Sequence, residues 1–271
     1  MSDASQRHGR KSAATASAPA RAEEMCWPIV ELRQYTLKPG RRDDLISLFE
    51  EHFVESQEEH GMQIIGQFRH CSNPDLFVWI RAFPDMEARH AALAGFYGGP
   101  IWKQYGPSAN DTMIDSDNVL LLKPSHSRAG FRYDPARRPA RDAAEAAGGV
   151  FLATVYSLAA PPSIAFVDFF ETGIVPTLRR AGATLEGQFV TEPSENTFKI
   201  LPVREGEHVF VWFASFADDA AYAAYDCALA QDDRWNTELA PALAAWLSKP
   251  EEQMKLVPSR RSQLRHRPAQ E

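Results

Sequence analysis

The chain has 271 residues, of which 44% are hydrophobic, and carries a formal net charge of -7 at pH 7. This acidic composition argues against nucleic acid or an anionic membrane surface as the default partner. The three cysteines, Cys26, Cys71 and Cys227, form no CxxC pair, which argues against a disulfide framework or a zinc site. Reduced thiols and the lack of an apolar run long enough to span a membrane favour a cytoplasmic location.

An internal repeat organises the sequence. Residues 77–85 read FVWIRAFPD, and residues 210–218 read FVWFASFAD. Both segments are apolar or small at nearly every strand position, which is typical of strands that are covered on both faces. The chain is therefore predicted to contain two copies of one domain, each with an ordinary hydrophobic core.

The first repeat alternates between strand and helix patterns. Its first helix follows Pro39-Gly40 and carries an apolar stripe, and its second helix is capped by Asp85 and ends near Tyr97. Four predicted strands flank these helices, at residues 29–37, 62–69, 77–83 and 118–123. The resulting order, β-α-β-β-α-β, is the split βαβ arrangement of ferredoxin-like folds, so the predicted class is α+β.

The second repeat follows the same order with one insertion. Tyr35 corresponds to Tyr156, 121 residues further on, whereas Trp79 corresponds to Trp212, 133 residues further on. The additional 12 residues are expected to lengthen the second hairpin around residues 192–208.

Five parts follow from this alignment, and each has its own predicted character. They are a disordered tail (1–27), the first ferredoxin-like domain (28–124), a Pro/Arg/Ala-rich linker (125–148), the second such domain (149–258) and a basic tail (259–271). The third strand of each repeat is aromatic on the face that a two-layer fold should leave bare. The two sheets are therefore expected to pack face to face as a pseudo-dimeric barrel, within one chain or between two chains of a homo-oligomer.

The opening of the first repeat resembles the NIPSNAP family. The resemblance rests on residues 31–40, ELRQYTLKPG, followed by an amphipathic helix and the Phe-Val-Trp strand. It covers nearly the whole first repeat and implies a dimeric α+β barrel. The second repeat has LATVY where the motif has ELRQY, so its motif is degenerate. Similar barrels include cofactor-free monooxygenases, haem-binding peroxidase-like proteins, small isomerases and non-catalytic binders, so the resemblance implies a fold more than a reaction.

Five polar and aromatic residues share one predicted sheet face. By strand parity, Glu31, Arg33 and Tyr35 point to one side of the first strand, and Trp79 and Arg81 could share that side on the third. One interpretation is a pocket inside the barrel, in which an arginine holds an anionic or carbonyl-bearing ligand and Glu31 or Tyr35 moves a proton. The other is an internal ion pair that orders the barrel.

Two further residues are candidates for the same site. His52 lies beside the apolar stripe of the first helix and could act as a general base or an axial haem ligand, although a partly exposed flank residue is the plainer interpretation. Trp102 recurs as Trp235 and could line a pocket or simply pack in a core. We expect no metal and no cofactor, with haem as the alternative.

Two hypotheses for function remain. The first is a cofactor-independent enzyme, monooxygenase-like or isomerase-like, acting on a hydrophobic or aromatic compound in the barrel pocket. The second is a non-catalytic protein that binds a small ligand or serves as a scaffold. A large aromatic cavity with unpaired polar groups would favour the enzyme, whereas a filled barrel with fully paired arginines would favour the second hypothesis.

Overall fold

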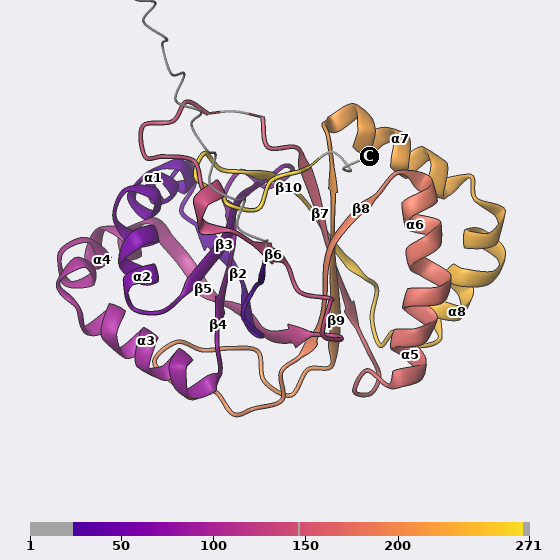
Figure 1. The fold of residues 1–271 in the computed structure, drawn as a ribbon, viewed down its shortest axis with the longest axis horizontal. Helices are drawn as coiled ribbons and strands as arrows, with labels where there is room; N and C mark the ends of the chain where they lie inside the picture. Colours follow the sequence, from indigo (N-terminus) through magenta and orange to yellow (C-terminus); the bar gives the residue numbers. More distant parts are fainter. Residues whose placement is uncertain (1–23, 146, 268–271) are drawn as a thin grey trace, which may run out of the picture.

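The computed structural model describes residues 24–145 and 147–267 and shows a central barrel flanked by helices on two sides (Figure 1). The strands of the first repeat are β2 (Ile29–Leu37), β3 (Gln63–His70), β4 (Leu76–Phe83) and β5 (Met113–Pro124). Those of the second repeat are β7 (Val150–Ser157), β8 (Thr184–Thr191), β9 (Val209–Phe216) and β10 (Glu252–Pro258).

These strands form one closed barrel in the order β10-β3-β4-β2-β5-β8-β9-β7. Within each repeat the order is ferredoxin-like, and the two sheets join at both edges through equivalent antiparallel pairs. Pro124 of β5 pairs with Phe189 of β8, and Pro258 of β10 pairs with Phe68 of β3. The prediction of tandem ferredoxin-like domains arranged as a pseudo-dimeric barrel is confirmed, and the barrel closes within a single chain.

Helices cover the outside of the barrel on each half. In the first repeat these are α1 (Arg42–Leu48), the π-helical turn η1 (Phe49–Phe53), α2 (Val54–Glu59), α3 (Met86–Gly98) and α4 (Pro100–Thr112). In the second they are α5 (Ile164–Phe169), η3 (Phe170–Ile174), α6 (Val175–Ala181), α7 (Asp219–Ala230), η4 (Trp235–Leu239) and α8 (Ala240–Ala244). Asp85 and Asp218 start α3 and α7 in the same way, because each carboxylate accepts a hydrogen bond from a backbone amide of the first turn.

The barrel interior is apolar, and the predicted site face lies on the other side of the sheet, which corrects the prediction for that face. Val30, Leu32, Val78 and Ile80 point inward and pack with residues of the second repeat. Trp79 instead packs with the helices of the first repeat, on the outer face of the sheet. An eight-stranded barrel is just wide enough for its own side chains, and here aliphatic residues fill it together with phenylalanines from both repeats. A pocket inside the barrel is therefore ruled out for this structure.

The predicted linker and the two predicted tails are partly built into the fold. Phe131 of the linker and Leu264 of the C-terminal tail are buried in the barrel core. The short strand β1 (Glu24–Met25) pairs with β6 (Arg132–Tyr133), and a 3-10 turn, η2, spans Pro135–Arg137. Residues 1–23 and 268–271, which belong to the two predicted tails, lie outside the described residues.

Phe131 and Leu264 occupy similar places, since Phe131 lies seven residues beyond the end of β5 and Leu264 six residues beyond the end of β10. Ser125 and Ser259, which begin the two segments, each donate a backbone hydrogen bond to the carbonyl of an equivalent glutamine, Gln188 and Gln67 respectively. Each repeat thus ends in a segment that closes one part of the barrel core. The prediction of a tail from residue 259 onward misses this role.

Among the described residues, no helix is both long and apolar enough to cross a membrane.

Candidate functional site

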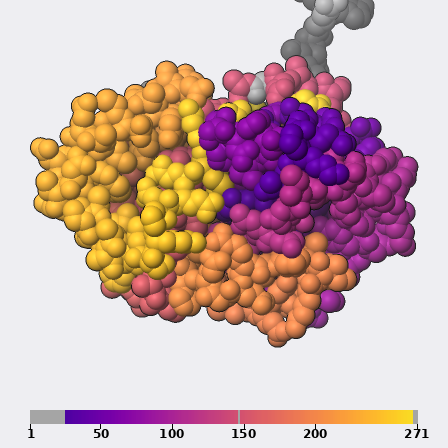
Figure 2. Space-filling view, turned by 180° about the vertical axis from the view of Figure 1, so that it is seen from behind, coloured from indigo at the N-terminus to yellow at the C-terminus, as the bar shows by residue number. Residues whose placement is uncertain are grey.

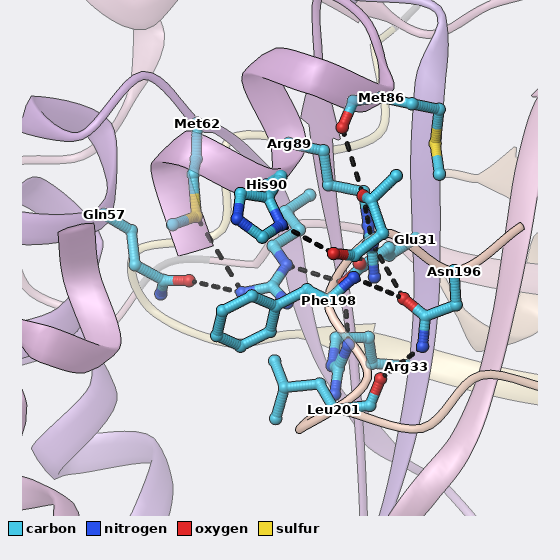
Figure 3. A network of polar contacts seen from close by, with 12 residues as sticks. Glu31, Arg33, Gln57, Met62, Met86, Arg89, His90, Asn196, Phe198 and Leu201 are labelled. Carbon is cyan, nitrogen blue, oxygen red and sulfur yellow. Dashed lines mark hydrogen bonds and ion pairs between the residues drawn. The ribbon is translucent and has the colours of Figure 1, made fainter. Parts of the chain in front are cut away.

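One carboxylate and three guanidinium groups meet beneath the helices of the first repeat (Figure 3). Glu31 and Arg33 come from β2, Arg81 from β4 and Arg89 from α3. The Glu31 Oε2 atom accepts hydrogen bonds from Arg33 Nη1 and from Arg81 Nε, both at 2.7 Å, and its Oε1 atom accepts one from Arg89 Nε at 2.6 Å. All four side chains are at most 1% exposed. We call these four residues the arginine cluster.

The arginine cluster carries an excess of two positive charges, because arginine stays protonated in proteins and only one carboxylate faces the three guanidinium groups. Burial alone would raise the pKa of Glu31, but Arg81, Arg33 and Arg89 outweigh it and hold that pKa well below its usual range. Glu31 is therefore an anion with both oxygens engaged, and it is poorly suited to accept a proton.

Two buried guanidinium nitrogens of the cluster have no partner among the described residues. Arg81 Nη1 donates to Gln57 Oε1 at 3.0 Å and Arg89 Nη1 donates to Asn196 Oδ1 at 3.0 Å. The Nη2 atoms of Arg81 and Arg89 are buried and meet no acceptor among the described residues. A buried charged donor without an acceptor is costly, so the arginines are not fully satisfied by the protein itself.

A small cavity with aromatic walls lies next to the cluster. Its volume is about 30 Å³, which is enough for water but not for an organic ligand. Its walls come from β2, β4 and β5 and from the helices that cover them: Tyr35, Leu45, Phe49, Phe53, Gln57, Trp79, Phe96, Tyr97, Trp102 and Met113. Three of these residues, Tyr35, Gln57 and Trp79, also contact the arginines.

Tyr35 links the cavity to the cluster. Its hydroxyl accepts a hydrogen bond from Arg33 Nε at 2.8 Å, and no described residue accepts the hydrogen that the hydroxyl could donate. Burial raises the pKa of Tyr35, and the neighbouring Arg33 opposes that shift without reversing it. Tyr35 is therefore a neutral phenol beside a cation, an arrangement suited to donating a hydrogen bond to an oxygen in the cavity.

A wider groove adjoins the small cavity on its outer side. It has a volume of about 570 Å³ and lies between α3, α4 and the long β8–β9 connection. Tyr97 and Trp102 line both spaces, so these two side chains separate the inner cavity from the groove. The other groove residues are mainly apolar: Ala94, Gly98, Asn110, Phe198, Ile200 and Leu201.

Comparison with known families bears on the first repeat. The NIPSNAP family model matches residues 30–128. The first repeat is a NIPSNAP domain. It contains every member of the arginine cluster and every residue that lines the inner cavity. No curated protein matches the chain in sequence.

Solved structures extend the likeness in fold over both repeats. A candidate monooxygenase from Fusobacterium nucleatum is 11% identical with a TM-score of 0.52, and the match covers 86% of this chain and 93% of that one. An anthrone oxidase-like protein is 13% identical with a TM-score of 0.56, and the match covers 86% and 91%. A NIPSNAP family protein of unknown function from Agrobacterium tumefaciens is 24% identical with a TM-score of 0.34, over 42% of this chain and 96% of that one.

The structure brings most of the candidate residues together beside the NIPSNAP domain's cavity, but not His52. Glu31, Arg33 and Arg81 belong to the arginine cluster, and Tyr35, Trp79 and Trp102 line the cavity. His52 lies outside the cavity lining, where its ring stacks on Tyr105 with a centroid distance of 3.6 Å. This position does not fit an axial haem ligand, and the 30 Å³ cavity does not fit the macrocycle.

Sequence reasoning missed Arg89, Gln57 and Asn196. Arg89 begins a buried helical stripe that continues with Ala92, Leu93 and Phe96. An arginine at an apolar position of an amphipathic helix is a signal that could have revealed it. Asn196 lies in the long β8–β9 connection of the second repeat, and nothing in its local sequence indicates a contact with α3. Among the described residues, no group of acidic, histidine or cysteine side chains is arranged to hold a metal ion.

Proposed function

We propose that the chain is a cofactor-independent enzyme acting on a flat, hydrophobic small molecule whose oxygen becomes anionic during the reaction. The observation that carries this proposal is the buried excess of two positive charges behind an aromatic cavity. An ion cluster that served stability alone would be expected to be neutral, because uncompensated buried charge is costly. Positive charge fixed in a buried site lowers the energy of a negative charge that develops nearby.

Three side chains would present this field to a ligand. The Tyr35 hydroxyl and the Gln57 amide lie between the cavity and the guanidinium groups of Arg33 and Arg81. Trp79 offers a flat wall on the same side, with Arg81 Cζ 5.0 Å from its ring centroid. A planar substrate stacked on Trp79 with its oxygen at Tyr35 would therefore have its enolate or phenolate form stabilised.

The chemistry that suits such a site is oxygenation of an activated aromatic carbon, as in an anthrone. Loss of a C–H proton gives the enolate, whose carbon bonds to dioxygen, and loss of water from the resulting hydroperoxide leaves a carbonyl group. Overall, a substrate CH₂ group and O₂ become a C=O group and water. The cavity lining includes no carboxylate or histidine, so we assign the proton to water and the enolate stabilisation to the cluster.

Substrate access would require Tyr97 and Trp102 to move. The inner cavity is too small for a tricyclic compound, but the adjoining groove of about 570 Å³ is within the size range of ligand pockets. Because both side chains line both spaces, a rotation of their rings would join the two into one site. The apolar body of the substrate would then lie in the groove and its oxygen at Tyr35.

The test is dioxygen uptake with anthrone as the substrate. We expect the wild-type protein to consume one O₂ for each anthraquinone formed, and Tyr35→Phe to lower kcat/KM by about 10²-fold, as for loss of one oxyanion donor. Tyr156, the equivalent residue of the second repeat, provides the matched control, and Tyr156→Phe should act like wild type. If the wild-type protein binds anthrone but does not oxidise it, the proposed enzymatic activity is refuted.

A second candidate is a non-catalytic ligand-binding protein, and one observation favours it. The barrel is filled with apolar side chains and the inner cavity holds only about 30 Å³, so the site is closed in this structure. A binder would retain an aromatic acid or phenol without changing it. Mass spectrometry of the ligand before and after incubation in air separates binding from oxidation.

A further inference from the structure

The long β8–β9 connection of the second repeat lies against the first repeat. It spans residues 192–208, whereas the equivalent β3–β4 connection spans residues 71–75. Figure 2 shows this segment, orange near residue 200, directly against the indigo and magenta surface of the NIPSNAP domain. Thr197 accounts for two of the contacts, because its hydroxyl donates to the Met86 carbonyl and its own carbonyl lies 2.6 Å from His90 Nδ1.

Asn196 makes the shorter of the two contacts between this segment and the arginine cluster. Its side chain is buried, and its Oδ1 atom accepts from Arg89 Nη1 at 3.0 Å and from the Phe198 amide at 3.1 Å (Figure 3). Its Nδ2 atom donates to the Leu201 carbonyl at 2.8 Å. One side chain thus holds the turn of the segment and the guanidinium group of Arg89 in a fixed relation.

Arg89 passes this constraint to the cluster. Its Nε atom donates to Glu31 Oε1, while Glu31 Oε2 is shared by Arg33 and Arg81. Arg89 comes from a helix and the other three members come from strands, so its orientation is set from outside the sheet. Without Asn196, only the weaker contact with Thr197 Oγ1 at 3.4 Å would remain at Arg89 Nη1.

We propose that Asn196 is a positioning residue for Arg89, so that the second repeat completes the site of the first; this assignment rests on the proposed function. The second repeat has no arginine cluster of its own, since the equivalent positions are Leu152, Thr154, Ala214 and Tyr222. Its contribution is a polar contact that fixes one of the three cations. The class of ligand affected is an aromatic oxyanion, because only an anion depends on where that cation lies.

The experiment uses 2-naphthol as a probe, because its neutral and anionic forms have different absorption spectra. The pKa of the bound probe reports the ratio of anion affinity to neutral affinity. We expect the wild-type protein to lower that pKa and Asn196→Ala to reduce the affinity ratio about tenfold, because a charge-directed contact acts on the anion. Glu195→Ala removes an exposed ion pair with Lys199 in the same segment and should leave the ratio unchanged.

The same ratio separates positioning from simple covering of the site. If Asn196 only keeps the segment folded over the groove, Asn196→Ala weakens both probe forms equally and the ratio stays at the wild-type value, which would overturn the proposal. If the wild-type protein binds naphtholate but does not oxidise anthrone, the proposed oxygenase activity is refuted, and the effect of Asn196→Ala on the affinity ratio still decides the role of Asn196. Wild-type protein that binds neither form would overturn both proposals.

Discussion

The two repeats place opposite chemistry on equivalent sheet faces. Beneath the helices of the first repeat, Glu31 bridges three arginines, whereas Leu152 occupies its position in the second repeat and packs in an apolar core. The aromatic residues are shared, since Trp79 corresponds to Trp212 and both are buried. The fold therefore forms equally well without the charges. This difference separates what the barrel requires from what one repeat adds.

The π-helical turns make the same distinction. Each repeat has one at the same place in its first helix, η1 and η3, although in the described part of the chain the arginine cluster lies beneath the helices of the first repeat and not of the second. Such turns often occur near functional sites. Here the turn is a property of the scaffold, and it directs Phe49 and Phe53 towards the cavity in one repeat and Phe170 towards an apolar core in the other. The arginine cluster, not the helix geometry, distinguishes the two halves.

The largest effect is expected from Glu31→Leu, which gives the first repeat the residue of the second at one position only. It would leave three buried guanidinium groups with no carboxylate, and we expect a loss of about 3–5 kcal/mol in the free energy of unfolding. Urea unfolding at neutral pH measures this loss. Full conversion to the second-repeat set should recover most of it; that variant combines Glu31→Leu, Arg33→Thr, Arg81→Ala and Arg89→Tyr.

A fourfold variant that stayed as unstable as Glu31→Leu would show that the cluster is needed for folding of the first repeat. It would also remove the reason for assigning the excess charge to function. Anthrone turnover should be absent from both variants, since neither retains the charges that stabilise an enolate.

A smaller loss of stability is expected from Arg81→Met. Glu31 keeps two partners, Arg33 and Arg89, and the excess charge falls by one, so the free energy of unfolding should change by no more than about 1 kcal/mol. Anthrone turnover should nevertheless fall by about 10²-fold, because one of the cations behind Gln57 is gone. Thermal unfolding and oxygen uptake on this one variant distinguish a functional role of Arg81 from a purely structural one. A large loss of stability with full activity would contradict our assignment.

Strand parity and the internal repeat were sufficient to predict the fold and the common face of Glu31, Arg33 and Arg81. They could not assign that face to the barrel interior or to the helix layer. In a closed barrel flanked by helices both faces of β4 are buried, so burial itself does not distinguish them. Side-chain size does not distinguish them either, because the interior holds Phe213 at the position equivalent to Ile80, whereas Trp79 lies beneath the helices.

The residues beyond sequence reasoning are those that depend on contacts between repeats. Asn196 and Arg89 are 107 positions apart, and their contact exists because the barrel closes and brings the long β8–β9 connection over α3. Phe131 and Leu264 were missed for a related reason. Each lies in a segment whose composition suggests a linker or a tail, and each becomes a core residue only once the barrel is formed.

The pH dependence of stability should differ between wild type and the fourfold variant. The folded-state pKa of Glu31 lies below its unfolded value of about 4.5, so its contribution is fully present above that pH and declines as pH falls towards the folded value. Below pH 4.5 the wild-type free energy of unfolding should decrease more steeply, by up to about 1.4 kcal/mol per pH unit. Urea unfolding between pH 3 and 6 tests this, since the other acidic groups are common to both proteins. Parallel curves would contradict it.

The smallest expected effect concerns a glutamine that both repeats retain. Gln67 and Gln188 pair across the sheet with Trp79 and Trp212 respectively. Among the described residues neither amide atom of the fully buried Gln67 has a hydrogen-bond partner, whereas Gln188 is 7% exposed and its Oε1 atom is buried without one. An unsatisfied buried amide is unfavourable, so Gln67→Leu should raise the free energy of unfolding by about 1 kcal/mol and Gln188→Leu by less.

The sign of the Gln67→Leu effect is the informative part of this last comparison. A gain in stability would mean that the unpaired amide destabilises the first repeat next to its site. Buried polar groups without partners often have such a functional explanation. A loss of more than about 1 kcal/mol would mean that the amide makes hydrogen bonds in solution, for example to water. In that case Gln67 would be a further polar residue of the candidate site, and the anthrone assay on Gln67→Leu would show whether the reaction depends on it.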